Sequence, residues 1–247
     1  MILLNDKNEE FKNRNRKKIA QMFNDKKLKK TSEKWFLESY KYEYSYHFSW
    51  LGRPIIQYPQ DMIAMQEIIW NYKPDIIIET GIAHGGSLIF SASILELIGK
   101  GEVVGIDIDI REHNKKEIKK HPLYKRITML EGSSIDKKTR DKIIKLSKNK
   151  KAIVFLDSNH TEKHVLKELE FYSPLVTKGG YVVVFDTIIE DLPEEFVQNR
   201  NWGKKNNPKS AINKFLKKND RFKIDKNLEK KLLVSAAKDG YLKCIKN

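Results

Sequence analysis

Acidic side chains stand at the ends of five short apolar runs, and this pattern carries the clearest chemical meaning in the sequence. The runs are rich in β-branched residues and do not alternate, which is typical of strands buried on both faces. The acids are Glu79, Asp107, Glu131, Asp157 and Asp186. Because the carboxyl ends of parallel strands share one edge of a sheet, we expect a ligand crevice there. One or two of the acids are expected to be helix N-caps instead; the others suit a metal, or a ligand with hydroxyls or positive charge.

A glycine-rich segment, residues 79–87 with the sequence ETGIAHGGS, follows the first run. Its spacing is G-x-x-x-G-G, so neither the dinucleotide fingerprint G-x-G-x-x-G nor a P-loop is present. Glycines let the backbone turn tightly beside a ligand, and the N-terminus of the following helix suits a carboxylate. An acid just before the first glycine suits an ammonium group, so the amino-acid part of S-adenosylmethionine fits. The cofactor-binding residues predicted here are Glu79, Gly81, His84, Gly85 and Ser87.

Two further run ends fit the nucleoside part of such a cofactor. Asp107 ends the second run, where a carboxylate can hold ribose hydroxyls, and Asp109 is the competing candidate two residues later. Ser133 and Ser134 follow the third run and are placed to meet a base edge. We predict that all four residues contribute to cofactor binding.

The elements that must position these residues alternate along the chain. Strands are predicted at residues 75–80, 103–107, 127–131, 152–157 and 181–186. Helices are predicted at residues 61–71, 87–98, 112–121, 135–147, 161–172 and 209–219. This alternation implies right-handed crossovers and therefore an α/β fold with a doubly wound, mostly parallel sheet.

The C-terminal end departs from that alternation. Short apolar runs at 222–224 and 232–236 precede an Asp-Gly pair at 239–240 and a further run at 241–245. An Asp-Gly pair between two apolar runs favours a tight turn. We therefore predict a C-terminal antiparallel hairpin that closes the sheet.

The N-terminal end differs as well. Residues 1–45 are charged, with apolar positions spaced as in amphipathic helices. Residues 46–60 form an aromatic segment with two prolines, and this composition predicts a loop. We predict an N-terminal helical arm at 1–45 and one domain at 46–247. Such an arm must dock on something, and a homo-oligomer formed through it is one expectation.

The net charge of +15 first suggests a nucleic-acid partner, but its distribution weakens that interpretation. The basic residues are 40 Lys and only 8 Arg, whereas phosphate and base recognition favour the Arg fork. Residues 35–199 hold 22 basic and 24 acidic side chains, a net of −2, so the excess lies in the Lys-rich flanks. Nucleic acid is therefore not the partner we expect.

The remaining composition limits the class of protein. A single cysteine, Cys244, excludes a disulfide framework and a cysteine-based zinc site. The N-terminal sequence MILLNDKNEEF lacks the apolar run of a signal peptide, and no apolar run approaches the length of a membrane span. We expect a cytoplasmic protein without a membrane span.

Taken in order, several stretches of the chain resemble a known family. They are PDIIIETGIAHGGSL, VVGIDIDIREHN, FLDSNHTEKHVLKELEFYSPLV and VVVFDTIIEDLP, within about Trp50 to Tyr241. The chain resembles the cephalosporin hydroxylase family, whose members are similar to class I S-adenosylmethionine-dependent O-methyltransferases and include sugar methyltransferases. The resemblance implies a Rossmann-like fold, S-adenosylmethionine as methyl donor and, in some members, Mg²⁺.

Transfer of a methyl group to an aliphatic hydroxyl needs a base, a metal or both, because such hydroxyls are poor acids. His160, three residues after Asp157, is the predicted general base, and Asp157 is the second catalytic candidate. Asp157 is also assigned to the cofactor site. Asp157 and Asp186 end neighbouring strands and are predicted to share a divalent cation, with Thr187 or water completing an oxygen shell. The cephamycin member of the family has a Glu where this chain has Phe185, so one metal ligand fewer is expected.

The aromatic segment supplies the predicted acceptor wall, since sugars stack on aromatic faces. The predicted substrate residues are Trp50, Arg53, Tyr58, Gln60, His160 and Asp186. Filling of the core is the alternative role of these aromatic residues.

The function we predict is transfer of a methyl group from S-adenosylmethionine to a hydroxyl of a nucleotide-linked or glycan-bound sugar. The assignment to surface polysaccharide biosynthesis rests on the family resemblance alone. Two alternatives stay open: a nucleic-acid methyltransferase or RNA-binding protein that uses the Lys-rich flanks, and a non-catalytic S-adenosylmethionine-binding module.

Overall fold

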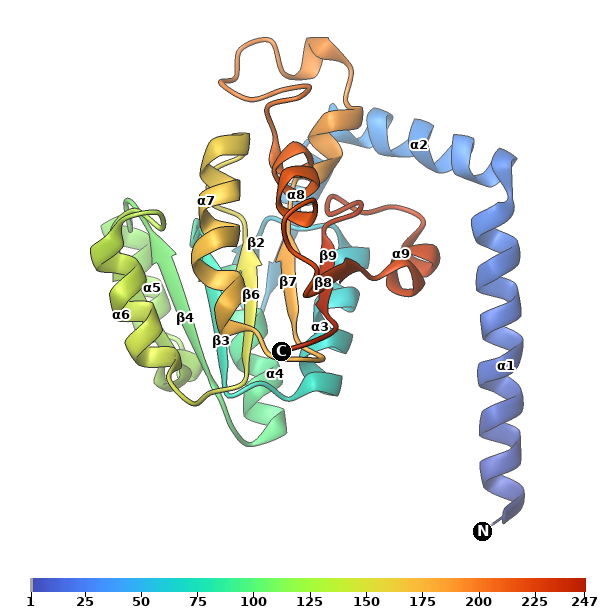
Figure 1. The fold of residues 1–247 in the computed structure, drawn as a ribbon, viewed down its shortest axis with the longest axis horizontal. Coiled ribbons are helices and arrows are strands. Elements are labelled where there is room, and N and C mark those ends of the chain that lie inside the picture. Colours follow the sequence, from blue (N-terminus) through green and yellow to red (C-terminus); the bar gives the residue numbers. More distant parts are fainter. Residues whose placement is uncertain (1) are drawn as a thin grey trace.

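A central sheet of seven strands organises the molecule (Figure 1). The computed structural model describes the backbone of residues 2–247 and the side chains of residues 7–247. Across the sheet the strand order is β5-β4-β3-β6-β7-β9-β8. The strands are β3 (Ile76–Thr80), β4 (Glu102–Asp107), β5 (Ile127–Glu131), β6 (Ala152–Leu156), β7 (Tyr181–Val184), β8 (Phe222–Ile224) and β9 (Tyr241–Cys244).

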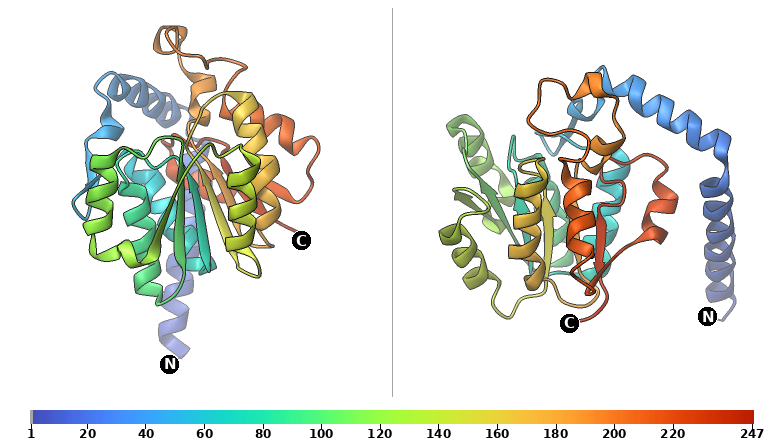
Figure 2. Two further views of the ribbon diagram at one scale, coloured as in Figure 1. Left: turned by 90° about the vertical axis from the view of Figure 1, so that its left-hand side faces the viewer. Right: turned by 45° about the horizontal axis from the view of Figure 1, so that its top comes forward.

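The five predicted strands β3 to β7 pair in parallel, which confirms the doubly wound sheet. The helices of this region are α3 (Pro59–Tyr72), α4 (Gly86–Ile98), α5 (Glu112–Lys120), α6 (Lys137–Ser147), α7 (Glu162–Tyr172) and α8 (Pro208–Leu216). Successive residues of β3 point to opposite faces, so Ile77 joins the core beneath α3, α4 and α5, whereas Ile76 and Ile78 join the core beneath α6, α7 and α8. Both faces of the sheet are therefore covered by helices (Figure 2).

The C-terminal strands are antiparallel, but the predicted hairpin turn is wrong. β9 pairs with both β7 and β8, and Phe222 lies opposite Cys244. Helix α9 (Lys226–Leu232) occupies the connection because Leu228 and Leu232, four residues apart, bury one apolar face. Asp225 caps this helix by accepting hydrogen bonds from two backbone amides of its first turn. The run at 232–236 therefore ends a helix and enters a loop instead of forming a strand.

The N-terminal residues form two helices, α1 (Ile2–Asn24) and α2 (Lys26–Tyr40). Asp25 starts the second helix by accepting a hydrogen bond from the Leu28 amide. Phe36 of α2 is buried and stacks on Tyr58 with ring centroids 4.9 Å apart, which anchors this helix on the domain. Helix α1 descends beside the domain and approaches it at its end next to α2 (Figure 1), where the Phe23 ring lies 3.6 Å from Lys29 Nζ.

Residues 46–60, expected as a loop, contain a short antiparallel hairpin of β1 (Phe48–Trp50) and β2 (Arg53–Ile55). Leu51 and Gly52 turn the chain with φ of 45° and 85°, a two-residue turn with positive φ at both positions that matches the twist of a hairpin. This hairpin packs against α4 and so brings the aromatic segment to the edge of the sheet where the glycine-rich turn lies.

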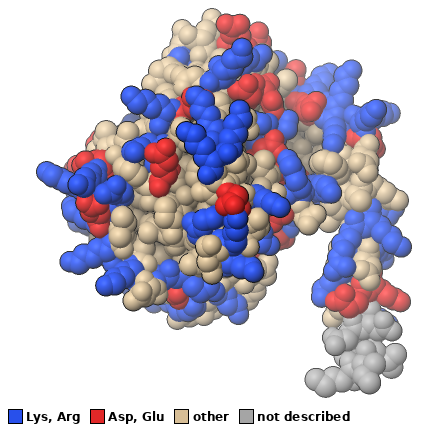
Figure 3. All heavy atoms as spheres, in the orientation of Figure 1, with Lys and Arg blue, Asp and Glu red and all other residues tan. Residues whose placement is uncertain are grey.

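Lysine and arginine side chains are scattered over the face seen in Figure 3, with acidic side chains among them. Within residues 2–247, no helix has both the length and the apolar composition that crossing a bilayer requires.

Candidate active site

The candidate site lies at the carboxyl ends of β3 and β6, the neighbouring strands at which the strand order reverses. Ligands of open α/β sheets bind at such a switch point. A cavity of about 290 Å³ opens there. Its lining includes the glycine-rich turn after β3, Asp157 and His160 after β6, and Asp186 after β7. The sheet therefore brings three of the five predicted strand ends to one cavity or its edge.

The glycine-rich turn requires its glycines for steric reasons. Gly81 has φ of 91°, and a Cβ there would stand 2.1 Å from the backbone oxygen of Asp157. A Cβ on Gly86 would stand 2.1 Å from the carbonyl oxygen of Pro54. The turn is thus pressed between the ends of β6 and the β1–β2 hairpin, and only glycine permits that approach.

Glu79 is buried just below this turn. The Ser87 hydroxyl donates a hydrogen bond to Glu79 Oε1, whereas Oε2 is buried without a partner among the described residues. Burial raises the pKa of Glu79 to about 7, and the Ser87 hydrogen bond opposes that rise. A buried carboxylate oxygen without a donor is costly, so this atom is suited to receive a donor from a ligand.

The predicted cofactor residues that do not line this cavity are Glu79, Gly85, Asp107, Asp109, Ser133 and Ser134. Asp107 Oδ2 accepts hydrogen bonds from the Ile82 amide at 2.8 Å and the Ala83 amide at 3.4 Å, so this carboxylate holds the glycine-rich turn. Asp109 is exposed. Ser134 is buried, with its hydroxyl 2.9 Å from His164 Nε2.

His84 and Ser133 complete the predicted cofactor set. The backbone carbonyl of His84 accepts two hydrogen bonds from the Arg53 guanidinium, at 3.0 and 2.6 Å, and the residue lines the cavity. Ser133 is half-buried beside Ser134, at the end of the neighbouring strand β5.

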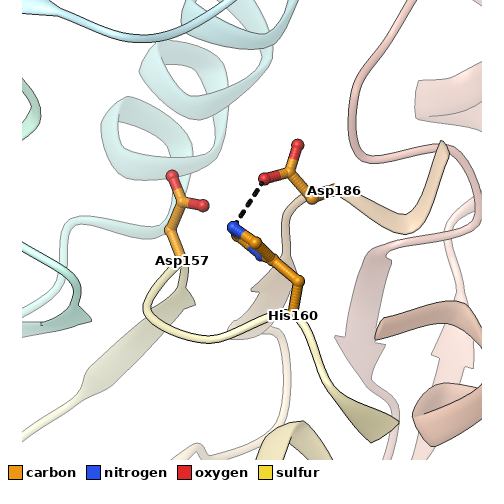
Figure 4. Close-up of side chains that lie close together, drawn as sticks. All are labelled: Asp157, His160 and Asp186. Atoms are coloured by element: carbon orange, nitrogen blue, oxygen red, sulfur yellow. Dashed lines mark ion pairs between the residues drawn. The ribbon is translucent and has the colours of Figure 1, made fainter. Parts of the chain in front are cut away.

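Asp157, His160 and Asp186 converge in the cavity (Figure 4). One ligand atom from each lies within 4.8 Å of the others, and His160 Nε2 is 3.3 Å from Asp186 Oδ2. Burial, followed by the charge of Asp186, holds the pKa of Asp157 well above the usual range of a carboxyl. Gln57 Nε2 donates to Asp157 Oδ2 at 3.0 Å and so fixes this carboxylate. Two carboxylates and an imidazole in this arrangement can move a proton or hold a divalent cation.

The conformation of Asp186 and the side chains of its two neighbours, Phe185 and Thr187, decide which groups could hold a metal there. Asp186 has φ of 55°, a strained conformation for a residue other than glycine that recurs at functional sites. The Thr187 hydroxyl is buried and donates to the Ala236 carbonyl, so completion of the oxygen shell by Thr187 or by water stays a prediction. Phe185 is buried, with its ring centroid 6.3 Å from that of Phe155, and offers no oxygen to the cluster.

The fold places only some of the residues predicted for the acceptor wall at the cavity. Tyr58 lines the cavity. Trp50 instead packs edge-on against Phe90 and donates to Ser93 Oγ at 3.0 Å, so its ring belongs to the core. Arg53 supports the glycine-rich turn through the His84 carbonyl and Asn114. Gln60 and these two residues are not among the described residues that line the cavity.

The cavity is lined largely by aromatic and basic side chains that were not predicted for the acceptor wall. The aromatic and basic residues lining the cavity are Phe36, Tyr40, Tyr46, Tyr58, Phe185, Trp202 and Arg200, besides the two histidines His84 and His160. Sequence reasoning could have reached Tyr46 and Gln57, which lie in the aromatic segment. No pattern in the sequence marks Trp202 and Arg200, because a long irregular connection after β7 carries them.

The family model described as rhamnosyl O-methyltransferase/CmcI matches residues 42–245. The chain belongs to this family. The rhamnosyl O-methyltransferase/CmcI match thus covers the whole seven-stranded sheet and the cluster of Asp157, His160 and Asp186.

Individual relatives in this family match a smaller region. A rhamnosyl O-methyltransferase of Mycobacterium leprae (strain TN) is 31% identical over 147 residues, which are 59% of this chain and 62% of that protein. A rhamnosyl O-methyltransferase of Mycobacterium tuberculosis (strain ATCC 25618 / H37Rv) is 31% identical over 141 residues, 54% of each protein. The matched region therefore spans less than two thirds of either relative.

Solved structures share the fold. CmcI with Mg and SAM superposes with a TM-score of 0.56 at 18% identity, covering 81% of this chain and 77% of the other. A protein from Staphylococcus aureus described as a putative caffeoyl-CoA O-methyltransferase gives 0.52 at 18% identity, covering 76% and 83%. The Rossmann-like methyltransferase fold predicted from the sequence is thereby confirmed.

Proposed function

We propose that this protein transfers the methyl group of S-adenosylmethionine to a sugar hydroxyl. The observation that carries the proposal is the meeting of His160 with Asp157 and Asp186 in one cavity beside the glycine-rich turn. A base, two carboxylates and a turn that admits a ligand at close range are the groups that such a transfer needs. The family and the names of its members support the same reaction.

The residues at the end of β3 fit the proposed cofactor. Glu79 Oε2, buried and without a described partner, would accept a hydrogen bond from the ammonium group of the methionine part. Gly81 and Gly86 let the turn pack directly against the backbone of Asp157 and Pro54, and this fixes the position of the turn beside the cavity. Bound there, S-adenosylmethionine supplies an electrophilic methyl group on a sulfonium. The structure of CmcI with Mg and SAM, a protein of the same fold, supports this choice.

His160 is the proposed base. Its Nε2 takes the proton of the acceptor hydroxyl as the oxygen bonds to the methyl carbon and the S–C bond breaks. The carboxylate of Asp186, 3.3 Å from this nitrogen, stabilises the imidazolium that forms. Burial, followed by the charge of Asp186, raises the pKa of Asp157, and a positive charge shared by the two carboxylates would stabilise its ionised form.

The donor set also fits a magnesium ion. Mg²⁺ prefers oxygen ligands and keeps several waters, so the carboxylates of Asp157 and Asp186 would hold it from one side. A cation there would lower the pKa of an acceptor hydroxyl. With Phe185 beside Asp186 the protein offers two carboxylates, so we propose weak binding of the metal.

The acceptor we propose is a nucleotide-linked or glycan-bound sugar of a surface polysaccharide. Aromatic rings from α2, from residues 46–58 and from the connection after β7 line the cavity and suit a sugar ring. The relatives named rhamnosyl O-methyltransferase support a sugar as the acceptor.

Incubation with labelled S-adenosylmethionine and a panel of nucleotide sugars and glycosides, with and without a chelator, tests the proposal. We expect transfer to a sugar hydroxyl that is lost in Asp157→Ala and kept in His113→Ala, an exposed histidine of α5. Binding of the cofactor without transfer to any acceptor would favour the non-catalytic module. Tight, strongly salt-dependent binding of nucleic acid would favour the alternative that uses the Lys-rich flanks.

We also propose that α1 contacts a second copy of the chain. The helix runs beside the domain (Figure 2), and the Phe11 side chain is 53% exposed on it. Light scattering of the full chain should give a mass above one protomer, and Phe11→Glu should lower it. A monomer at all concentrations would contradict this proposal.

A further inference from the structure

An arginine at the mouth of the cavity, Arg200, has no ion-pair partner within the described part of the chain. The Arg200 guanidinium lies 5.5 Å from the centroid of the Trp202 ring. Arg126 and Arg140 form ion pairs with Glu96 and Asp141, whereas no described carboxylate pairs with Arg200. An exposed arginine held over a ring keeps its donor fork free for an anion.

This cation is close to the reacting groups. The Trp202 ring meets the His160 ring edge to face, with centroids 5.6 Å apart, so a single aromatic ring separates the guanidinium from the proposed base. On another side of the cavity, Arg200 lies near enough to Tyr40 and Tyr46 to lower the pKa of both phenols, although burial raises each pKa overall. Arg200 therefore stands at the rim of the space where an acceptor hydroxyl must lie to reach His160.

The charged groups at the inner end of the cavity differ from those at its rim. The carboxyl groups of Asp157 and Asp186 lie at its inner end, which suits a hydroxyl and disfavours an anionic group beside the Asp186 carboxylate. The rim carries the opposite charge through Arg200, which lines the cavity and has no described ion-pair partner. A ligand with a hydroxyl at one end and an anion at the other is therefore oriented hydroxyl inward.

We propose that the acceptor is a sugar that carries a phosphate or diphosphate, which Arg200 binds while the sugar hydroxyl faces His160. The inference rests on the proposed function and makes its substrate class more specific. Phosphate oxygens match the planar donor fork of arginine in a bidentate contact, and the Trp202 ring beneath the guanidinium holds that fork in place. A neutral glycoside of the same sugar would lack this contact.

Two sources of such a sugar share this chemistry. One is a nucleotide sugar, and the other is a sugar diphosphate on a prenyl chain. A groove between α2 and α9, lined by apolar side chains and by charged ones such as Lys29 and Lys230, adjoins the cavity through Phe36, Ile188 and Leu192 and is the place where a prenyl chain would lie. Acceptor assays with UDP-, GDP- and dTDP-sugars and with a farnesyl diphosphate sugar distinguish the two sources.

The test compares Arg200→Gln with Arg14→Gln, which removes the same charge from an exposed position of α1. With a phosphate-bearing acceptor, we expect Arg200→Gln to raise KM about 10- to 100-fold, the range for loss of a charge-assisted hydrogen bond, and Arg14→Gln to leave it unchanged. With the methyl glycoside of the same sugar, Arg200→Gln should leave KM unchanged. Arg200→Lys, which keeps the charge and loses the fork, should fall between these values.

A binding measurement separates this inference from the proposed reaction. Calorimetry with UDP and with pyrophosphate, in the presence of S-adenosylhomocysteine, should detect binding that weakens at high salt and in Arg200→Gln. If neither anion binds the wild-type protein, or if Arg200→Gln changes KM equally for phosphorylated and neutral acceptors, the inference is wrong. Arg200-dependent binding of these anions without methyl transfer to any sugar would instead refute the proposed function and leave the anion site standing.

Discussion

The two sides of the candidate site are built in different ways. The proposed cofactor side consists of Glu79, the glycine-rich turn and Asp107, all at the ends of the adjacent strands β3 and β4, and two backbone amides of the turn donate hydrogen bonds to the Asp107 carboxylate. The acceptor side consists of the carboxylates and imidazole of the cluster and the aromatic cavity around it, and it draws on α2, the β1–β2 hairpin, the end of β6 and the connection after β7. The first is a local arrangement, whereas the second exists only when four distant segments meet.

This difference indicates which side of the site tolerates amino-acid substitution. Substitution of a glycine in the turn would meet backbone atoms at 2.1 Å, so the cofactor side is constrained by the path of the chain itself. The acceptor side rests on side chains such as Tyr46, Trp202 and Arg200, which are exposed or half-buried and lie on irregular segments. Surface connections tolerate substitution better than sheet edges do. We therefore expect the cofactor side to set the reaction and the acceptor side to set its substrate.

Replacement of the proposed base is the strongest test of the acceptor side. His160→Ala should lower kcat about 10²- to 10⁴-fold, because a positioned general base contributes that much, and should leave cofactor affinity unchanged. Single-turnover transfer and calorimetry with S-adenosylhomocysteine measure the two quantities. His113→Ala is the matched control. An unchanged rate in His160→Ala would refute its role as the base.

On the cofactor side, Glu79→Gln should weaken binding of S-adenosylhomocysteine about 10- to 100-fold, because a charge-assisted hydrogen bond to the ammonium group is lost. The kcat at saturating cofactor should stay close to wild type, in contrast to His160→Ala. Calorimetry and steady-state rates measure both. A large fall in kcat with unchanged affinity would show that the two sides are not separable in this way.

The pH dependence of binding follows from the same carboxylate. Burial raises the pKa of Glu79 to about 7, and an ammonium group binds the ionised form. Above pH 7 the carboxylate is ionised and affinity is at its plateau. As the pH falls below 7, protonation competes with the ligand, so the Kd for S-adenosylhomocysteine should rise about tenfold per pH unit. Titration by calorimetry between pH 5 and 8 measures this slope, and Glu79→Gln should remove it.

The smallest expected effect concerns Trp50, which sequence reasoning assigned to the acceptor side. Trp50→Phe removes the hydrogen bond to Ser93 and should lower the free energy of unfolding by about 1 kcal/mol, with acceptor KM unchanged. Tyr46→Ala, at a ring that lines the cavity, should raise KM several-fold and leave stability nearly unchanged. Urea unfolding and steady-state kinetics distinguish the two. A raised acceptor KM in Trp50→Phe would show that Trp50 contributes to acceptor binding.

Much of the sheet could be predicted from the sequence because buried parallel strands are short, β-branched and continuous, and each parallel strand lies within two residues of its expected bounds. The antiparallel closure of the sheet by β8 and β9 is confirmed, but the strand predicted at 232–236 is wrong because Leu228 and Leu232 share the apolar face of a helix that ends at residue 232. An Asp-Gly pair favours a turn wherever the chain must reverse, and it does not decide which segments that turn connects.

The sequence by itself determined the order of strands and helices, the glycine-rich turn, and the placing of Asp157, His160 and Asp186 at strand ends. Each of these follows from local patterns of burial, turn chemistry and the common direction of parallel strands. Only the tertiary structure decided that Trp50 enters the core, that Phe36 and Tyr40 of α2 reach the cavity, and that Arg200 and Trp202 stand at its mouth. The packing of irregular segments against one another depends on contacts between residues far apart in the chain, and no local pattern records them.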